Sequence, residues 1–156
     1  MKSKHRSWGA PTRGFTLVEV MIVVAIIAIL ARIAYPAYTS SVLKGKRAQA
    51  RAAILDLMQQ EERYLTQNNT YLAFTNTSGT IAPTSAASTF KVYVGDNSTS
   101  PPYWLSANAC GSQALTDCIQ VVATPVQSDP QVGSIRMTST GTKDCSVSTA
   151  GVLCWP

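Results

Sequence analysis

A long apolar run near the N-terminus constrains this chain more than any other feature. From Phe15 to Ala31 the only ionisable residue is Glu19, and the apolar character continues to about residue 38. At a rise of about 1.5 Å per residue, a helix over residues 15–38 is long enough to span the hydrocarbon core of a bilayer. Because it is apolar all round, such a helix must lie in lipid or at the centre of an assembly.

The basic charge of the chain is concentrated ahead of this run. Residues 1–14 carry Lys2, Lys4, Arg6 and Arg13 and no acid, which accounts for most of the formal net charge of +5. This segment is polar and shows no periodicity, so we expect it to be a leader that is removed by processing. The remainder is close to neutral, and its bulk charge does not indicate a DNA-binding protein.

The chain after the apolar run is predicted to continue as a helix. Pro36 should kink or interrupt it, because the proline ring removes a backbone hydrogen bond and crowds the preceding turn. An amphipathic helix is expected over residues 40–68, ending at Asn68-Asn69. Its apolar stripe is assigned to Val42, Ala48, Ala52, Leu55, Met58 and Leu65, with Lys46, Arg47, Arg51, Gln59, Glu62 and Arg63 largely outside it.

Short alternating segments between about residues 89 and 140 predict a small antiparallel sheet, after a surface loop over residues 70–88. The expected strands are Phe90 to Val94, Tyr103 to Ala107, Ile119 to Ala123 and Ile135 to Met137. A sheet lying on the amphipathic helix would cover both half-apolar surfaces. The predicted fold class is α+β, with a long kinked N-terminal helix and a small antiparallel sheet packed on its C-terminal half. Residues 39–156 would form the head.

Four cysteines fall in the last 47 residues, at Cys110, Cys118, Cys145 and Cys154. Their spacing contains no C-x-x-C and no histidine lies nearby, which disfavours zinc and favours two disulfides in an oxidising compartment. Three pairings are possible. We favour Cys110–Cys118 and Cys145–Cys154 because each closes a short loop, the second being a cysteine loop over residues 145–154.

The string Arg13-Gly14-Phe15-Thr16-Leu17-Val18-Glu19, followed by the apolar run, resembles the signature of a type IVa prepilin. The layout of the rest of the chain is similar to a major or minor pilin. The resemblance implies that a prepilin peptidase cuts between Gly14 and Phe15 and then methylates the new amine of Phe15. Two positions depart from the family pattern: Ala28 replaces a usual glycine, and Arg32 occupies a site that is usually small and apolar. Arg32 lies near the outer end of the apolar helix, where it can snorkel to the interface.

Glu19 is expected to set the register of assembly. A charged residue at the centre of a membrane helix costs about 2.5–3.5 kcal/mol, so Glu19 needs a partner. Cleavage before Phe15 would create a cationic amine four residues upstream, which Glu19 can neutralise within one subunit or between neighbours. Pairing of Glu19 with the amine of a neighbouring copy would fix the axial position of the added subunit, because an unmatched charge in apolar surroundings is strongly penalised.

By this resemblance, the predicted function is that of a structural subunit of a type IV pilus, serving twitching motility, adhesion and DNA uptake. A first alternative is a pseudopilin of a type II secretion system, which has the same N-terminus. A DNA-receptor pilin of a competence pilus ranks lower, because only Lys91, Arg136 and Lys143 could form a basic stripe on the distal body. A plain secretory signal cut near residues 31–34 is a further alternative for the N-terminal segment.

We expect no enzymatic activity, metal or cofactor, because His5 is the only histidine and lies in the leader. The implied partners are other pilin subunits, the prepilin peptidase and methyltransferase, an inner-membrane assembly platform and membrane lipid, with nucleic acid left open. The implied location is the inner membrane, as a single-pass prepilin with a periplasmic head, and then the extracellular filament.

Overall fold

The computed structural model describes residues 14–147 and 151–156. The chain divides into two compact units, Met1–Ser41 and Val42–Pro156, and helix α1 (Leu17–Asn68) contributes to both. In the first unit, every α1 residue from Leu17 to Ser41 is exposed.

Helix α1 continues through Pro36 without a break, so the predicted interruption is wrong. Proline removes only one backbone donor, so the helix keeps its other backbone hydrogen bonds. In the next turn, Thr39 Oγ1 also donates to Pro36 O at 3.0 Å and Ser41 Oγ to Ala37 O at 3.0 Å. The kink at Pro36 stays a prediction.

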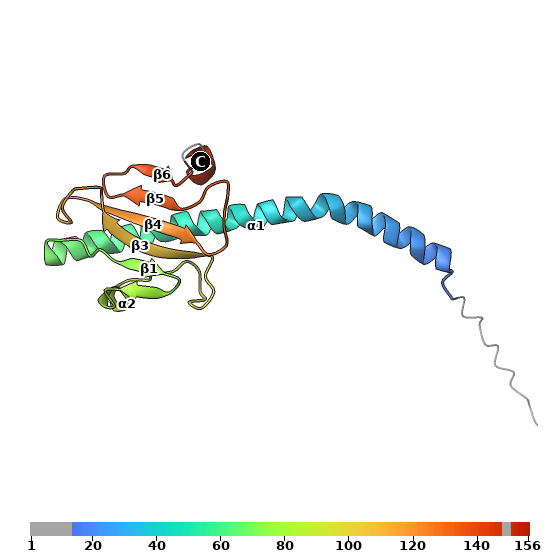
Figure 1. Ribbon diagram of the computed structural model, residues 1–156, viewed down its shortest axis with the longest axis horizontal. Coiled ribbons are helices and arrows are strands. Elements are labelled where there is room, and N and C mark those ends of the chain that lie inside the picture. The colour runs from blue at the N-terminus through green and yellow to red at the C-terminus, as the bar shows by residue number, and fades with distance from the viewer. Residues whose placement is uncertain (1–13, 148–150) are drawn as a thin grey trace, which may run out of the picture. The chain divides into compact units, whose positions relative to one another are not determined.

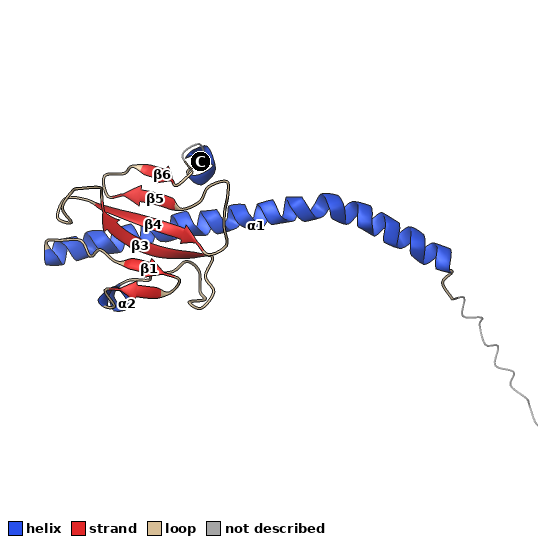
Figure 2. Cartoon of the chain, viewed as in Figure 1, coloured by secondary structure: helices blue, strands red, loops and turns tan. Residues whose placement is uncertain are grey.

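In the second unit, a four-stranded antiparallel sheet packs against residues 42–68 of α1 (Figure 1), which confirms the α+β class. Its strand order is β3-β4-β5-β6, and a two-stranded hairpin, β1-β2, accompanies it. The elements after α1 are β1 (Thr75–Thr77), β2 (Thr80–Ala82), α2 (Ser85–Thr89), β3 (Tyr103–Ala109), β4 (Ile119–Pro125), β5 (Ile135–Thr138), β6 (Lys143–Cys145) and α3 (Gly151–Cys154), as Figure 2 shows.

The core lies between α1 and the inner face of the sheet. Alternate residues of β3 and β4, such as Tyr103, Leu105, Ile119 and Val121, are fully buried, as strand periodicity requires. From α1 the buried residues are Arg47, Ala50, Ile54, Leu57, Met58 and Glu61.

The buried stripe of α1 differs from the predicted one. Ala48, Ala52 and Leu55 are exposed, and of the six residues assigned to the stripe only Met58 is buried. The true stripe follows steps of three and four residues but includes a cation and an acid, Arg47 and Glu61. An assignment that required apolar residues at every step therefore selected a neighbouring face.

Helix α1 ends at Asn68, where Asn68-Asn69 was expected to stop it. Asn69 has a φ of 58°, in the left-handed region, and its N–H donates to Leu65 O at 2.7 Å. This is a helix C-terminal arrangement that asparagine tolerates better than most residues.

Two predictions for the segment between α1 and β3 were wrong. Residues 70–88 are not a plain loop, because they contain β1, β2 and most of α2. Residues 90–94 bury Phe90, Val92 and Val94 as expected but do not form a regular strand. Their backbone contacts β3 through a single bridge, Tyr93 to Trp104. At the other end, β6 extends the sheet beyond the predicted limit of residue 140.

The structure contains the disulfides Cys110–Cys118 and Cys145–Cys154, with Cα–Cα distances of 5.5 and 6.6 Å. This is the pairing that sequence analysis favoured. The first closes the turn between β3 and β4, and the second ties α3 to β6.

Candidate functional site

The first candidate site is the apolar half of α1. Its large apolar side chains are between 49% and 75% exposed, and Phe15, immediately before the helix, is 82% exposed. Among the described residues, α1 is the one helix long and apolar enough to cross a membrane. So large an apolar surface is unfavourable in water and marks a membrane or protein contact.

Glu19 lies in the first turn of this half. Its backbone N–H donates to Thr16 Oγ1 at 3.2 Å, an N-terminal capping contact with an acid in the first turn, where the helix dipole favours negative charge. Gly14 and Phe15 precede the helix and are exposed. The structure thus places the residues predicted for cleavage, methylation and register together at one helix end.

The second candidate site is a basic cluster around the Cys145–Cys154 loop. Arg51 Nη1 donates to Cys154 O at 3.1 Å, and Arg136 Nη2 donates to Cys145 O at 2.8 Å. Lys143 Nζ lies 5.0 Å from the ring centroid of Trp155. Three cations from α1, β5 and β6 therefore meet at one loop beside an indole. The acid in contact with them is Asp144, which pairs with Arg136 at 2.9 Å.

The sequence did not predict this cluster as a unit. Arg136 and Lys143 were candidates for a basic stripe together with Lys91, but Lys91 lies beside β3, at the other end of the four-stranded sheet order. There Lys91 Nζ is 4.0 Å from Asp96 and 5.3 Å from the Tyr93 ring centroid. Arg51 was expected outside the apolar stripe of the amphipathic helix. The favoured Cys145–Cys154 disulfide was the signal that could have brought these cations together.

Arg47, expected outside the apolar stripe of α1, is instead buried in an ion pair. Its Nε and Nη2 donate to the two carboxylate oxygens of Asp129 at 2.7 and 2.8 Å, and Nη2 also donates to Gln131 Oε1 at 3.0 Å. Both side chains of the pair are at most 4% exposed. The backbone N–H groups of Gln131 and Val132 donate to Asp129 Oδ1. The pair joins α1 to the β4–β5 connection.

The charge state of this pair follows from its contacts. Burial acts to raise the pKa of Asp129, but the hydrogen bonds and charge of Arg47, with the two backbone N–H groups, outweigh it and lower the pKa. The hydrogen bond to Asp129 raises the pKa of Arg47 despite its burial. Both groups are therefore charged at neutral pH.

Glu61 is a second buried ionisable group on the same stripe. It is fully buried, and its Oε2 accepts a hydrogen bond from Leu72 N at 3.0 Å, while Oε1 has no partner among the described residues. Burial raises the pKa of Glu61 to about 7, against the lowering effect of the Leu72 hydrogen bond and with a further rise from the charge of Glu62. This carboxyl gains its proton near neutral pH.

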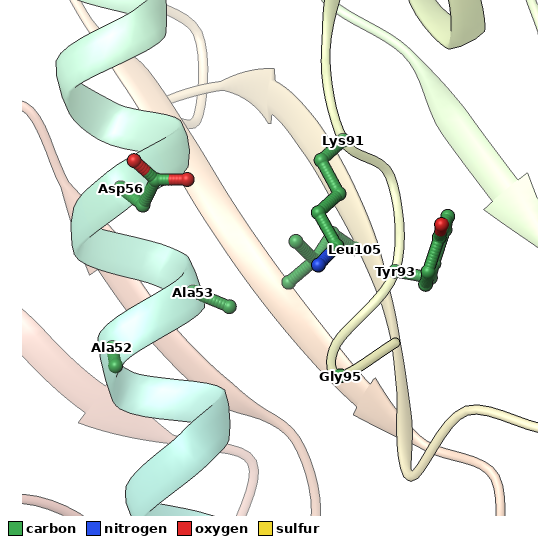
Figure 3. Close-up of a pocket in the computed structure, with 7 residues that line it drawn as sticks. All are labelled: Ala52, Ala53, Asp56, Lys91, Tyr93, Gly95 and Leu105. Atoms are coloured by element: carbon green, nitrogen blue, oxygen red, sulfur yellow. The ribbon is translucent and has the colours of Figure 1, made fainter. Parts of the chain in front are cut away.

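A small pocket lies between α1 and residues 91–95, and Figure 3 shows its lining. Asp56 extends from the helix, and Lys91 and Tyr93 come from the opposite segment. The remaining lining residues are Ala52, Ala53, Gly95 and Leu105. One acid facing one lysine makes this a mixed-charge recess, in contrast to the basic cluster.

Comparisons with known proteins point to one class. A family model described as the type IV minor pilin ComP, DNA uptake sequence receptor, matches residues 36–122. A model of the prokaryotic N-terminal methylation motif matches residues 10–35. The chain is also similar to the type IV major pilin protein PilA of Myxococcus xanthus strain DK1622. The two are 39% identical over 67 residues, which cover 43% of this chain and 30% of the relative. The chain thus matches less than a third of the length of that relative.

Proposed function

The chain belongs to the type IV minor pilin family whose model it matches over more than half its length, and we propose that its apolar helix first anchors it in the inner membrane and then packs against other subunits in the pilus. The chain is accordingly a structural pilin that assembles with other pilin subunits. The observation that carries the proposal is the apolar half of α1, in which every residue is exposed, together with a folded unit that has its own core.

Processing of the N-terminus is part of the proposal. A prepilin peptidase cuts between Gly14 and Phe15 and methylates the amine of Phe15, as the match to the methylation motif supports. Glu19 then neutralises that amine on a neighbouring copy in the filament. In the membrane the head lies on the periplasmic side, and an assembly platform in the inner membrane adds the subunit to the growing fibre.

The test uses three variants of the full chain expressed in the native host. Gly14→Val blocks cleavage, which the mass of the membrane-bound subunit reports. Glu19→Ala leaves cleavage intact but lowers the amount of subunit in sheared filaments about tenfold or more, because the amine loses its partner. Asp56→Ala, which removes an exposed acid from the same helix, is the matched control and leaves the filament amount unchanged.

Native filament levels of Glu19→Ala would contradict the pairing role of Glu19. A normal mature mass for Gly14→Val would contradict the cleavage site. The pseudopilin alternative is tested separately by deletion of the gene. Loss of twitching with protein secretion intact supports a pilus subunit, and the reverse supports a secretion pseudopilus.

DNA binding is a second candidate function, favoured by the description of the matched family and by the basic cluster around the Cys145–Cys154 loop. We infer that Arg51, Arg136 and Lys143 contact phosphates of duplex DNA, with Trp155 beside them as an aromatic contact. Arg51 lies inside the matched segment, whereas the other two lie beyond it. The family description and the basic cluster raise the DNA-receptor alternative, which the sequence alone placed lower because only Lys91, Arg136 and Lys143 could form a basic stripe.

The experiment is a fluorescence titration of duplex DNA with the full chain in detergent at several salt concentrations. Each phosphate contact contributes about 0.9 to the slope of log affinity against log salt. Lys143→Gln is expected to weaken binding several-fold and to reduce that slope by about one. Lys91→Gln, an exposed lysine beside β3, is the control and leaves both unchanged. Equal loss in the two variants would point to diffuse charge and contradict a site at the cysteine loop.

A further inference from the structure

The apolar half of α1 contains a second charge, of opposite sign to Glu19. Among residues 14–43, Glu19 is the only acid and Arg32 the only base. Both side chains are exposed, and neither has an ion pair or a side-chain hydrogen bond with the described residues. Each is therefore a charge on an apolar surface that must be covered by lipid or protein.

The two charges cannot neutralise each other within one helix. They are thirteen residues apart, which is about 20 Å along the helix axis at about 1.5 Å per residue. At 3.6 residues per turn they also lie about 140° apart around the axis. One copy thus presents its carboxylate on one side and its guanidinium, about 20 Å further along, on nearly the opposite side.

The same separation is tolerable in a bilayer but not in a filament core. In the membrane each group lies within a few residues of an end of the apolar segment, and the long side chain of Arg32 can reach the interface there. When copies surround one another, that route to water closes. A buried charge without a partner is then strongly destabilising.

We propose that Arg32 of each copy binds Glu19 of a neighbouring parallel copy that is displaced by about 20 Å along the helix axis, an inference that rests on the proposed pilus function. The partner is a second copy of this chain, selected by charge complementarity. Because the two charges lie on different sides of the helix, the contact is heterologous: each copy uses Glu19 toward one neighbour and Arg32 toward another. Such a contact does not close on itself and generates an open helical filament.

The pairing with Arg32 is compatible with an amine partner for Glu19. A carboxylate has two oxygens with about four lone-pair sites, so it can accept from an ammonium group and from a guanidinium together. Arginine suits a desolvated site better than lysine, because its guanidinium is weakly hydrated and matches the geometry of a carboxylate. The pair therefore adds a second constraint on axial register.

The test converts this contact into a covalent bond in assembled filaments. Filaments of Arg32→Lys are treated with the apolar reagent dicyclohexylcarbodiimide, which condenses an amine and a carboxylate in direct contact into an amide. Mass spectrometry of the digested filaments is expected to show a peptide that joins residue 19 to the introduced amine at position 32. Because these positions lie about 20 Å apart in one helix, the product must join two copies.

The matched control moves the cation by one residue, with Arg32→Gln combined with Ile33→Lys. This keeps the net charge but turns the amine by about 100° around the helix, and the cross-link should fall at least tenfold. Arg32→Gln alone should lower the filament amount at least fivefold, while the membrane-bound pool of subunit stays at the native level.

Three results would overturn the inference: filaments of Arg32→Lys that show no coupling, coupling of Glu19 to the Phe15 amine alone, or native filament levels for Arg32→Gln. If Arg32→Gln instead depletes the membrane-bound pool and the remaining subunits assemble normally, Arg32 binds a lipid headgroup and the inference fails. Failure of the unsubstituted chain to enter any filament would contradict the proposed function itself, which separates the two outcomes.

Discussion

The buried pair of Arg47 and Asp129 joins α1 to the rest of the head through a bidentate contact. Every oxygen of Asp129 is hydrogen-bonded, and the guanidinium uses two of its nitrogens on the carboxylate. A pair of this kind contributes little net stability compared with apolar residues, but removal of one partner leaves a charge in the core.

We expect Asp129→Ala to lower the free energy of unfolding by about 3–5 kcal/mol, because Arg47 would remain buried and unpaired. The measurement is urea unfolding of the full chain in detergent, followed by the fluorescence of Trp104 and Trp155. Asp144→Ala, which breaks the half-exposed pair with Arg136, is the control and should cost about 1 kcal/mol or less. Similar losses in both variants would contradict the buried pair.

Glu61 makes the stability of the head depend on pH. Its pKa is about 7 in the folded chain against 4.5 for the ordinary side chain, so the folded state binds the proton more tightly than the unfolded state. The free energy of unfolding should therefore rise as pH falls from about 8 toward 4.5, by up to about 3 kcal/mol. Asp129, with a lowered pKa, loses its contribution only below this window.

Glu61→Gln is the variant that isolates this effect. It should stabilise the head at pH 8 and flatten the dependence on pH between about 4.5 and 8, as measured by urea unfolding at a series of pH values. Asp56→Asn, which neutralises an exposed acid of the same helix, should retain the slope. A flat profile in the unsubstituted chain would refute the assignment of a raised pKa to Glu61.

At the scale of elements, periodicity predicted the long helix, its end at Asn68 and the alternation within β3, β4 and β5. It did not predict the correct face of α1, because Arg47 and Glu61 occupy buried steps whose partners, Asp129 and Leu72, lie outside the helix. Such tertiary partners leave no local signal.

The segment between α1 and β3 shows a different limit. Residues 90–94 alternate like a strand and bury the expected side chains. They pair with β3 through one bridge only and so do not form a regular strand. The β1–β2 hairpin lies in a Ser- and Thr-rich stretch without an apolar face. Its turn at Ser78 and Gly79 has positive φ at both residues, as two-residue hairpin turns require, but Ser-Gly is a weak turn signal.

The start of β5 depends on the glycine before it. Gly133 has a φ of +66°, and a β-carbon there would overlap Ser146 Oγ, which accepts a hydrogen bond from Ser134 N at 2.9 Å. Gly133→Ala should therefore destabilise the head by about 1–2 kcal/mol more than Gly141→Ala. Gly141 has a φ of +88° with open space around it, so alanine there would meet the backbone strain but no steric overlap. Equal midpoints for the two variants in thermal unfolding would exclude the overlap.

The whole molecule combines an exposed apolar half-helix, which is unfavourable in water, with a head that has its own core and two disulfides. Residues 14–19 resemble a prepilin signature, and this resemblance predicted the pilin class. The matches to the minor pilin family and the methylation motif confirm it. The bulk charge did not predict the basic cluster, because its members come from α1, β5 and β6 and are brought together only by the tertiary fold.

Phe15 and the apolar half of α1 are proposed to form the shared core of a filament after cleavage before Phe15. The most direct test is the intact mass of this subunit recovered from sheared filaments. The account predicts a chain that begins at Phe15, carries one methyl group on its amine and retains both disulfides. Recovery of a chain that begins elsewhere, or its absence from filaments while it accumulates in the membrane, would contradict the account.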